Sequence, residues 1–144
     1  MTNTKLIASA LAVVLSLASA PAFANNVYIE QHGLWNQAGG GQAGIANQIG
    51  VYQDGFFNGV YAEQSGAGNV SGAGQVGINN GYDSHQVGWN NEAGAAQFGA
   101  NHNASINQDG IDNTAVGIQV GNGCDYTVDQ NGAGNVSAFV QVCP

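Results

Sequence analysis

Glutamine recurs at every eleventh position of this sequence, and this spacing limits the possible folds more than any other feature. The glutamines in register are Gln31, Gln42, Gln53, Gln64, Gln75, Gln86, Gln97, Gln108, Gln119, Gln130 and Gln141. A glycine lies two residues after each of the first ten. Five residues after them come Asn36, Asn47, Asn58, Asn69, Asn80, Asn91, Asn113 and Asn135, with His102 and Cys124 in the two other places. Biased composition does not keep such a register, so the sequence contains a structural repeat.

The positions between the glutamines fall into two classes, counted here with the glutamine as position 1. Positions 8 and 10 carry no charge and no amide, whereas all nine acidic residues fall at positions 2, 5, 7, 9 or 11. Successive side chains of a strand point to opposite faces, so positions 6, 8, 10 and 1 share one face. We predict that this face is the interior. Each repeat should form one strand of about six or seven residues, with a turn from the glycine to the asparagine.

The size of the coil follows from two large side chains at position 8. A coil of one repeat would have little internal space, and Tyr82 and Tyr126 need it. We therefore favour two strands and two arcs in each 22-residue rung, since two repeats of eleven make one coil. The predicted fold is an all-β, amyloid-like β-solenoid of about five rungs. Both tyrosine rings should point inward, with Ala104 leaving room between them.

The glutamines and asparagines are the predicted structural site. In a 22-residue rung the glutamines of alternate repeats stack in one column on each sheet, and the asparagines stack beside the arcs. An amide has both donors and acceptors, so stacked amides can bond to one another along the axis. A buried amide without a partner costs about 1–3 kcal/mol, which explains the strict register. The outermost strands and amides have no partner, so another copy can add to either end and form a filament.

The sequence before the repeat is typical of a signal peptide. Lys5 supplies a positive charge, residues 6–17 are apolar, and Ala22-Phe23-Ala24 resembles a cleavage site. A transmembrane helix is the alternative, but the apolar stretch is shorter than the roughly 20 residues that a span requires. We predict a signal peptide over 1–24 and a repeat domain over 25–144, with no membrane span in the mature chain.

The charge of the predicted mature chain excludes several partners. Lys5 is the only lysine or arginine in the sequence, so residues 25–144 contain neither. Binding of nucleic acid or anionic lipid through phosphate contacts therefore has no cations to use. The excess of acidic residues favours solubility during export.

Two cysteines predict a disulfide in a chain that passes through an oxidising compartment. Cys143 should lie above Gly121 in a 22-residue rung, and Cys124 ends the arc that Gly121 begins. The Cα atoms then approach the window that a bridge requires. The alternatives are two free thiols or a bridge between chains. A Cys124–Cys143 bridge would hold the final short strand in place and cap the C-terminal end, leaving growth to favour the other end.

No catalytic, metal-binding or cofactor-binding residues are predicted. Asp83, Ser84 and His85 are triad residue types, but adjacent residues of a strand face opposite ways. His32 and His102 occupy other positions of the repeat and do not converge with His85 on a metal. We therefore expect a protein that is not an enzyme and has no cofactor.

The aromatic residues near the arcs leave two interpretations open. Trp35, Phe56, Phe57 and Trp89 either cover the side of the solenoid or form an adhesive patch.

The repeats resemble those of curlins, whose pattern is Q-x-G-x-x-N-x-A-x-x-x-Q. Residues 86–97 and 108–119 match it at every fixed place, and the likeness extends over about residues 27–142. The resemblance implies a homopolymeric subunit of an extracellular, pilus-like amyloid fibre for biofilm matrix, adhesion or surface attachment. It also implies periplasmic transit, a nucleator subunit and an outer-membrane export pore as partners.

A second function remains open, namely a monomeric extracellular β-solenoid that binds polysaccharide or ice. Such proteins usually carry a regular outward row of threonine or aromatic residues, and position 9 shows no such row over the whole chain.

Overall fold

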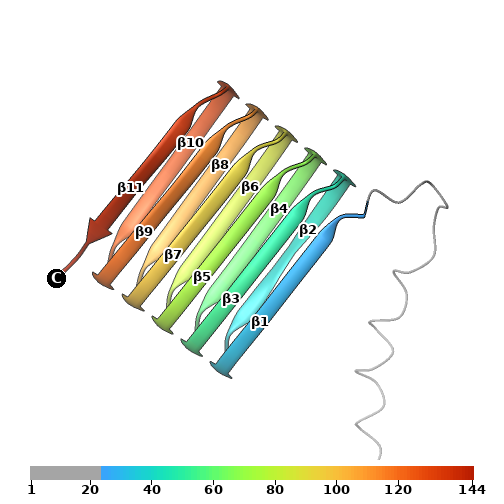
Figure 1. The fold of residues 1–144 in the computed structure, drawn as a ribbon. Helices are drawn as coiled ribbons and strands as arrows, with labels where there is room; N and C mark the ends of the chain where they lie inside the picture. The colour runs from blue at the N-terminus through green and yellow to red at the C-terminus, as the bar shows by residue number, and fades with distance from the viewer. Residues whose placement is uncertain (1–23) are drawn as a thin grey trace, which may run out of the picture.

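The fold is a stack of strands that run across a common axis (Figure 1). The computed structural model describes residues 24–144, so the predicted signal peptide lies outside the described residues except for Ala24. The strands are β1 (Asn26–Leu34), β2 (Gln37–Ile45), β3 (Gln48–Phe56), β4 (Gly59–Ala67), β5 (Val70–Ile78), β6 (Gly81–Trp89), β7 (Glu92–Ala100), β8 (Asn103–Ile111), β9 (Thr114–Asn122), β10 (Asp125–Ala133) and β11 (Val136–Val142).

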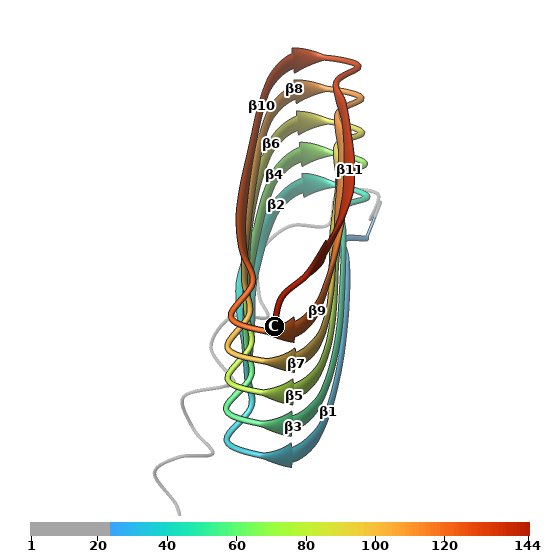
Figure 2. The ribbon, with the colours of Figure 1, turned by 90° about the vertical axis from the view of Figure 1, so that its left-hand side faces the viewer.

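The strands form two parallel sheets that face each other across a narrow interior (Figure 2). Sheet A has the order β1-β3-β5-β7-β9-β11, and sheet B has the order β10-β8-β6-β4-β2. Each strand pairs with the strand 22 residues away without a slip, so that Gln31 lies opposite Gln53 and Gln42 opposite Gln64. The predicted β-solenoid with 22-residue rungs is therefore confirmed.

The strands are longer than predicted, and the glycine at position 3 lies within them. Strands β1 to β10 each have nine residues, and only positions 5 and 6 lie between strands. The position-3 glycines have φ values from 102° to 135°, which bends the strand while its ladder continues. A Cβ atom at Gly77, for example, would fall on the carbonyl oxygen of Gly99 in the next rung. The predicted turn, from position 3 to position 6, is therefore too long, because only positions 5 and 6 lie between the strands.

The turn itself depends on position 5, which the sequence analysis did not identify. All ten residues there have positive φ, namely Trp35, Ala46, Phe57, Gly68, Asn79, Asn90, Asn101, Asp112, Gly123 and Gly134. Glycine, asparagine and aspartate adopt this conformation at little cost. Trp35, Ala46 and Phe57 adopt it at a cost of roughly 1–2 kcal/mol each. The first arcs of the solenoid are therefore more strained than the last ones.

The core consists of positions 8 and 10, as predicted. Tyr82 is 3% exposed and Tyr126 is 8% exposed, while Ala104 between their strands is fully buried. Tyr126 contacts Phe139 edge-on with ring centroids 4.2 Å apart. A Cβ atom at Gly117 would collide with both of these rings, so Gly117 makes room for them.

A small polar cluster lies within this core. The Ser71 hydroxyl is 2.6 Å from that of Ser84 and 3.2 Å from that of Tyr82. Burial raises the pKa of Tyr82, and the two serine hydroxyls oppose that effect. Burial also raises the pKa of Tyr126, whose hydroxyl has no hydrogen-bond partner among residues 24–144. Both phenols therefore remain neutral inside the solenoid.

Candidate functional site

The glutamine columns form continuous ladders of amide hydrogen bonds. On sheet A each Nε2 donates to the Oε1 of the next glutamine at 2.5–3.2 Å, from Gln31 through to Gln141. On sheet B the same bonds run from Gln42 to Gln130 at 2.7–2.8 Å. The second N–H of each inner amide donates to a backbone carbonyl across the solenoid, as from Gln86 to Val70 at 2.9 Å. The buried amides are thereby paired, and the ladders join the two sheets.

The asparagine columns run beside the arcs, and the hydrogen bonds between successive asparagines point along the axis in the direction opposite to those of the glutamines. In the column from Asn47 to Asn135, each Oδ1 accepts the backbone N–H of the asparagine one rung later at 3.0–3.2 Å. The Nδ2 of Asn69 also reaches the carbonyl oxygen of Gly88 at 2.9 Å. Glutamine ladders therefore donate toward the C-terminal end, and asparagine ladders donate toward the N-terminal end.

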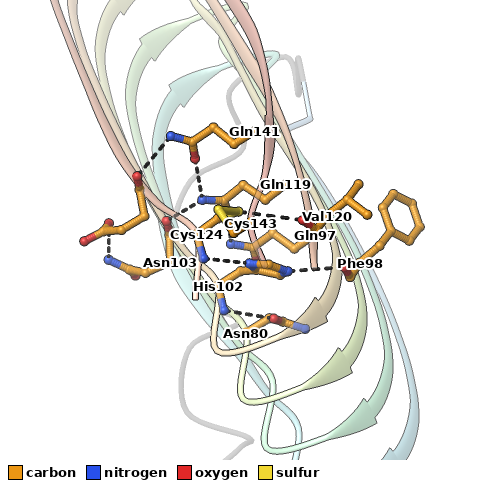
Figure 3. Close-up of a disulfide and its surroundings, with 11 residues drawn as sticks. Asn80, Gln97, Phe98, His102, Asn103, Gln119, Val120, Cys124, Gln141 and Cys143 are labelled. Atoms are coloured by element: carbon orange, nitrogen blue, oxygen red, sulfur yellow. Dashed lines mark hydrogen bonds between the residues drawn. A yellow bond between two sulfur atoms is a disulfide. The ribbon is translucent and has the colours of Figure 1, made fainter. Parts of the chain in front are cut away.

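His102 takes the place of an asparagine in the second column, after Asn36, Asn58 and Asn80. Its backbone N–H donates to Asn80 Oδ1 at 3.1 Å, and its Nδ1 accepts the N–H of Cys124 at 3.1 Å (Figure 3). Because Nδ1 accepts, the ring proton belongs on Nε2, which lies 3.2 Å from the Phe98 carbonyl oxygen. A neutral imidazole thus continues the column with the same polarity.

The column ends at a disulfide between Cys124 and Cys143 (Figure 3). Their Cα atoms are 5.6 Å apart, and the Cys143 N–H donates to the Val120 carbonyl oxygen at 2.9 Å. Cys143 directly follows the end of β11, so the bridge holds that end against the rung below. The carbonyl group of Cys143 lies where a Cβ atom of Gly121 would be, which requires glycine there.

The two ends of the solenoid carry unpaired strand edges. β1 and β2 lie at the N-terminal end, and β10 and β11 lie at the C-terminal end. The inner residues Val27 and Ile29 of β1 are 53% and 44% exposed, and they line a hollow of about 160 Å³ together with Gly40 of β2. Edges of this kind are templates for further strand pairing.

The outer faces of the two sheets differ in polarity. Sheet A exposes apolar side chains over its C-terminal half, including Phe98, Val116, Ile118, Val120 and Val140. Sheet B carries five acidic residues, Glu63, Asp83, Asp109, Asp125 and Asp129, and sheet A carries three, Glu30, Asp54 and Glu92. Of these apolar residues only Val116 lies at position 9, whereas Phe98 and Val120 lie at position 2 and Ile118 and Val140 at position 11. The search for an outward row at position 9 therefore did not find this face.

The aromatic residues near the arcs all remain exposed. Trp35 and Phe57 stack with centroids 5.0 Å apart, and Phe56 and Trp89 are the last residues of β3 and β6. These rings form an apolar rim on the sides of the solenoid rather than a buried cover.

The outer faces also carry hydrogen-bonded carboxylates. The Tyr28 hydroxyl donates to Glu30 Oε2 at 2.6 Å, and His32 Nε2 lies 2.8 Å from Glu30 Oε1. The Tyr28 hydrogen bond, followed by that of His32, lowers the pKa of Glu30. Tyr61 and Glu63 form a similar pair at 2.7 Å, which raises the pKa of Tyr61. These pairs were not predicted, although a tyrosine two residues before a glutamate marks both.

Asp83, Ser84 and His85, the triad residue types of the sequence, do not face one another in the structure. Ser84 is buried against Ser71, whereas Asp83 and His85 lie on the outer face of β6. Residues 24–144 contain no group of three or more histidine, cysteine, aspartate or glutamate side chains placed to hold a metal ion. The same residues include no helix with the length and apolarity needed to cross a membrane.

The chain matches a known family of repeats. A family model described as the curlin associated repeat matches residues 85–110, from the middle of β6 to the last residues of β8. No curated protein matches the chain.

Proposed function

We propose that this chain, whose matched repeat assigns it to the curlin family, is a secreted structural subunit that polymerises into extracellular amyloid fibres. The family and the β-solenoid fold indicate a structural protein rather than an enzyme. The fibre would serve in a biofilm matrix, in adhesion or in attachment to a surface.

The observation that carries this proposal is the complementarity of the two ends. Every earlier glutamine donates one rung onward, whereas Gln130 and Gln141 donate only to the Thr114 and Asp125 carbonyl oxygens, so their second N–H has no partner among the described residues. The first glutamines, Gln31 and Gln42, donate onward in the same way. Their Oε1 atoms receive no hydrogen bond from the described residues. A second copy supplies the missing partner at either end, so the ladders favour polymerisation.

The proposed route to the cell surface rests on the sequence. The signal peptide over 1–24 would direct the chain to the periplasm, and the disulfide Cys124–Cys143 is of the kind that forms there. An outer-membrane pore would then export the chain, and a nucleator subunit would start the fibre, as the curlin resemblance implies.

The test uses the mature chain, residues 25–144, purified in denaturant and then transferred to buffer. We expect thioflavin-positive fibres by electron microscopy, with fibre diffraction at about 4.8 Å along the axis. The matched variant is Gln130→Glu, whose carboxylate still accepts from Gln108 but cannot donate to a further copy and also loses the bond to the Thr114 carbonyl oxygen. It should slow assembly while the monomer keeps its strand content. A mature chain that stays monomeric at high concentration contradicts the proposal.

A second candidate function rests on the apolar outer face of sheet A. Exposed Val116, Ile118 and Val120 lie on a regular stack of strands, which suits a flat or repetitive surface such as polysaccharide or ice. A monomer that cosediments with insoluble polysaccharide, or that retards ice growth, would support this function instead.

A further inference from the structure

The two sheets contain different numbers of strands, and this difference constrains how copies can stack. Sheet A has six strands and sheet B has five, so the final strand β11 begins a rung that the described residues do not complete. We propose, on the basis of the fibre proposed above, that successive copies are related by a half-turn about the fibre axis. β1 of the next copy then pairs with β10, and its β2 pairs with β11.

The repeat places matching residues opposite each other in this arrangement. Both sheets keep the same eleven-residue positions, so Gln31 of the next copy lies over Gln130 and its Gln42 lies over Gln141. Gln130 Nε2 then donates to Gln31 Oε1, as every glutamine inside the chain donates one rung onward. All four terminal amides are paired in this way.

The asparagine ladder crosses the same junction. The arc between β1 and β2 of the next copy lies over the arc between β10 and β11, which places Asn36 over Asn135. Within the chain Asn135 donates to Asn113 Oδ1, and no described residue donates to the Asn135 Oδ1. The backbone N–H of Asn36 of the next copy is the donor that fits, since Asn58 makes the same bond to Asn36.

Packing inside the solenoid points to the same junction independently. Phe139 is the large inner residue of β11, and the residue one rung below it is Gly117, which leaves space for its ring. The half-turn places Gly40 of the next copy over Phe139, so that the ring lies between two glycines. Stacking without rotation would place Ile29 there instead, a branched side chain over an already crowded ring.

Stacking without rotation also leaves a gap. If β1 of the next copy paired with β11, then β2 would lie two steps above β10, or about 9.6 Å away instead of 4.8 Å. Sheet B would lack a strand at every junction, and the amides of Gln130 and of Gln42 would have no partner. The half-turn avoids this loss.

Half-turn stacking has a visible consequence for the fibre surface. The outer face of sheet A, apolar over its C-terminal half, and the more acidic outer face of sheet B alternate along each side of the fibre. Acidic patches thus interrupt the apolar surface at every subunit, which opposes side-by-side aggregation of fibres.

The experiment uses two pairs of cysteines introduced on outer faces. Glu30→Cys with Asp129→Cys joins neighbouring copies if β1 pairs with β10, because Cα atoms across paired strands lie within disulfide reach. Glu30→Cys with Val140→Cys joins them only if β1 pairs with β11. Strands β1 and β10 lie at opposite ends of one chain, so neither pair forms within a subunit. Peptide mapping checks that Cys124–Cys143 stays intact.

We expect oxidised fibres of the first pair to dissolve in denaturant as a ladder of covalent multimers, and fibres of the second pair to dissolve as monomers. Fibres that crosslink through the second pair, or through neither, overturn the half-turn while leaving fibre formation intact. A failure of all chains, including the parent, to form fibres contradicts the proposed function itself. Cryo-electron microscopy of parent fibres provides a second measurement. A half-turn predicts a rise of about 26 Å per subunit, whereas unrotated stacking predicts about 29 Å.

Discussion

The inner and outer faces of each strand follow different rules, although their residues alternate along the same nine-residue segment. Position 1 is glutamine in all eleven repeats, and from Gln53 to Gln130 these side chains are at most 8% exposed. Position 2, one residue later, is histidine, alanine, aspartate, serine, valine, phenylalanine or asparagine. A buried amide must find its partner in the next rung, whereas an exposed residue is satisfied by water. The ladder thus maintains the repeat, and the outer face is free to vary.

The largest expected effect comes from Gly77→Ala, on the bend of β5. The new methyl group would meet the backbone of Gly99, and φ at this residue is 135°. We expect a loss of more than about 3 kcal/mol, enough to abolish assembly. Gly74→Ala is the control, because a Cβ atom there meets nothing within 4 Å in the same strand. Denaturant unfolding and fibre yield compare the two, and equal behaviour would show that the bend does not require glycine.

Removal of one inner amide should lower the free energy of unfolding by less than Gly77→Ala does, but by more than any substitution on the outer face. Gln75→Ala and Gln86→Ala each break the ladder bonds to the glutamines above and below, at a cost of about 1–3 kcal/mol. Both should lengthen the lag before fibrillisation, measured by thioflavin fluorescence. Asp54→Asn on the outer face should leave the lag unchanged or shorten it, since it reduces repulsion. The reverse ranking would mean that the two faces have been exchanged.

The disulfide should contribute a somewhat smaller amount, and only at the C-terminal end. Cys124 and Cys143 are separated by 19 residues, and closing such a loop stabilises by about 3 kcal/mol in the chain-entropy model. The double variant Cys124→Ser with Cys143→Ser should lose part of this stability, with hydrogen exchange increasing first in β10 and β11. Reduction of the parent chain should reproduce the effect. Equal exchange in all rungs would contradict a local role.

The smallest effect is expected from Tyr28→Phe on the outer face of β1. It removes the main cause that lowers the pKa of Glu30, so this pKa should rise toward its ordinary value. A lowered folded-state pKa adds stability above the unfolded pKa, and this stability is lost as the pH falls through the folded value. The variant should therefore be slightly less stable only at neutral pH. NMR titration of the Glu30 carboxyl measures the shift, with Tyr52→Phe as the control.

The sequence predicted the features that depend on periodicity. The 22-residue rung, the inner face and the inward rings of Tyr82 and Tyr126 all follow from which residues tolerate burial beside a copy of themselves. The local backbone could not be predicted in this way. Phe57 is a poor residue for positive φ, and it adopts this conformation in an arc whose next residue, Asn58, is held by the stacked ladder. The position-3 glycine suggested a turn, because glycine is required both in a tight turn and at a bend inside a strand.

The disulfide also determines how a pulling force enters the subunit. Tension applied at Pro144 passes from Cys143 directly to Cys124, because the covalent bond bypasses residues 125–142. Strands β10 and β11 lie within that bypass, so neither can be peeled away while the bond holds. Load from this terminus is first carried by β9, which pairs with a strand on each side. A fibre dragged by flowing water would therefore keep the two strands that face the next copy, even when the tail of the chain is under strain.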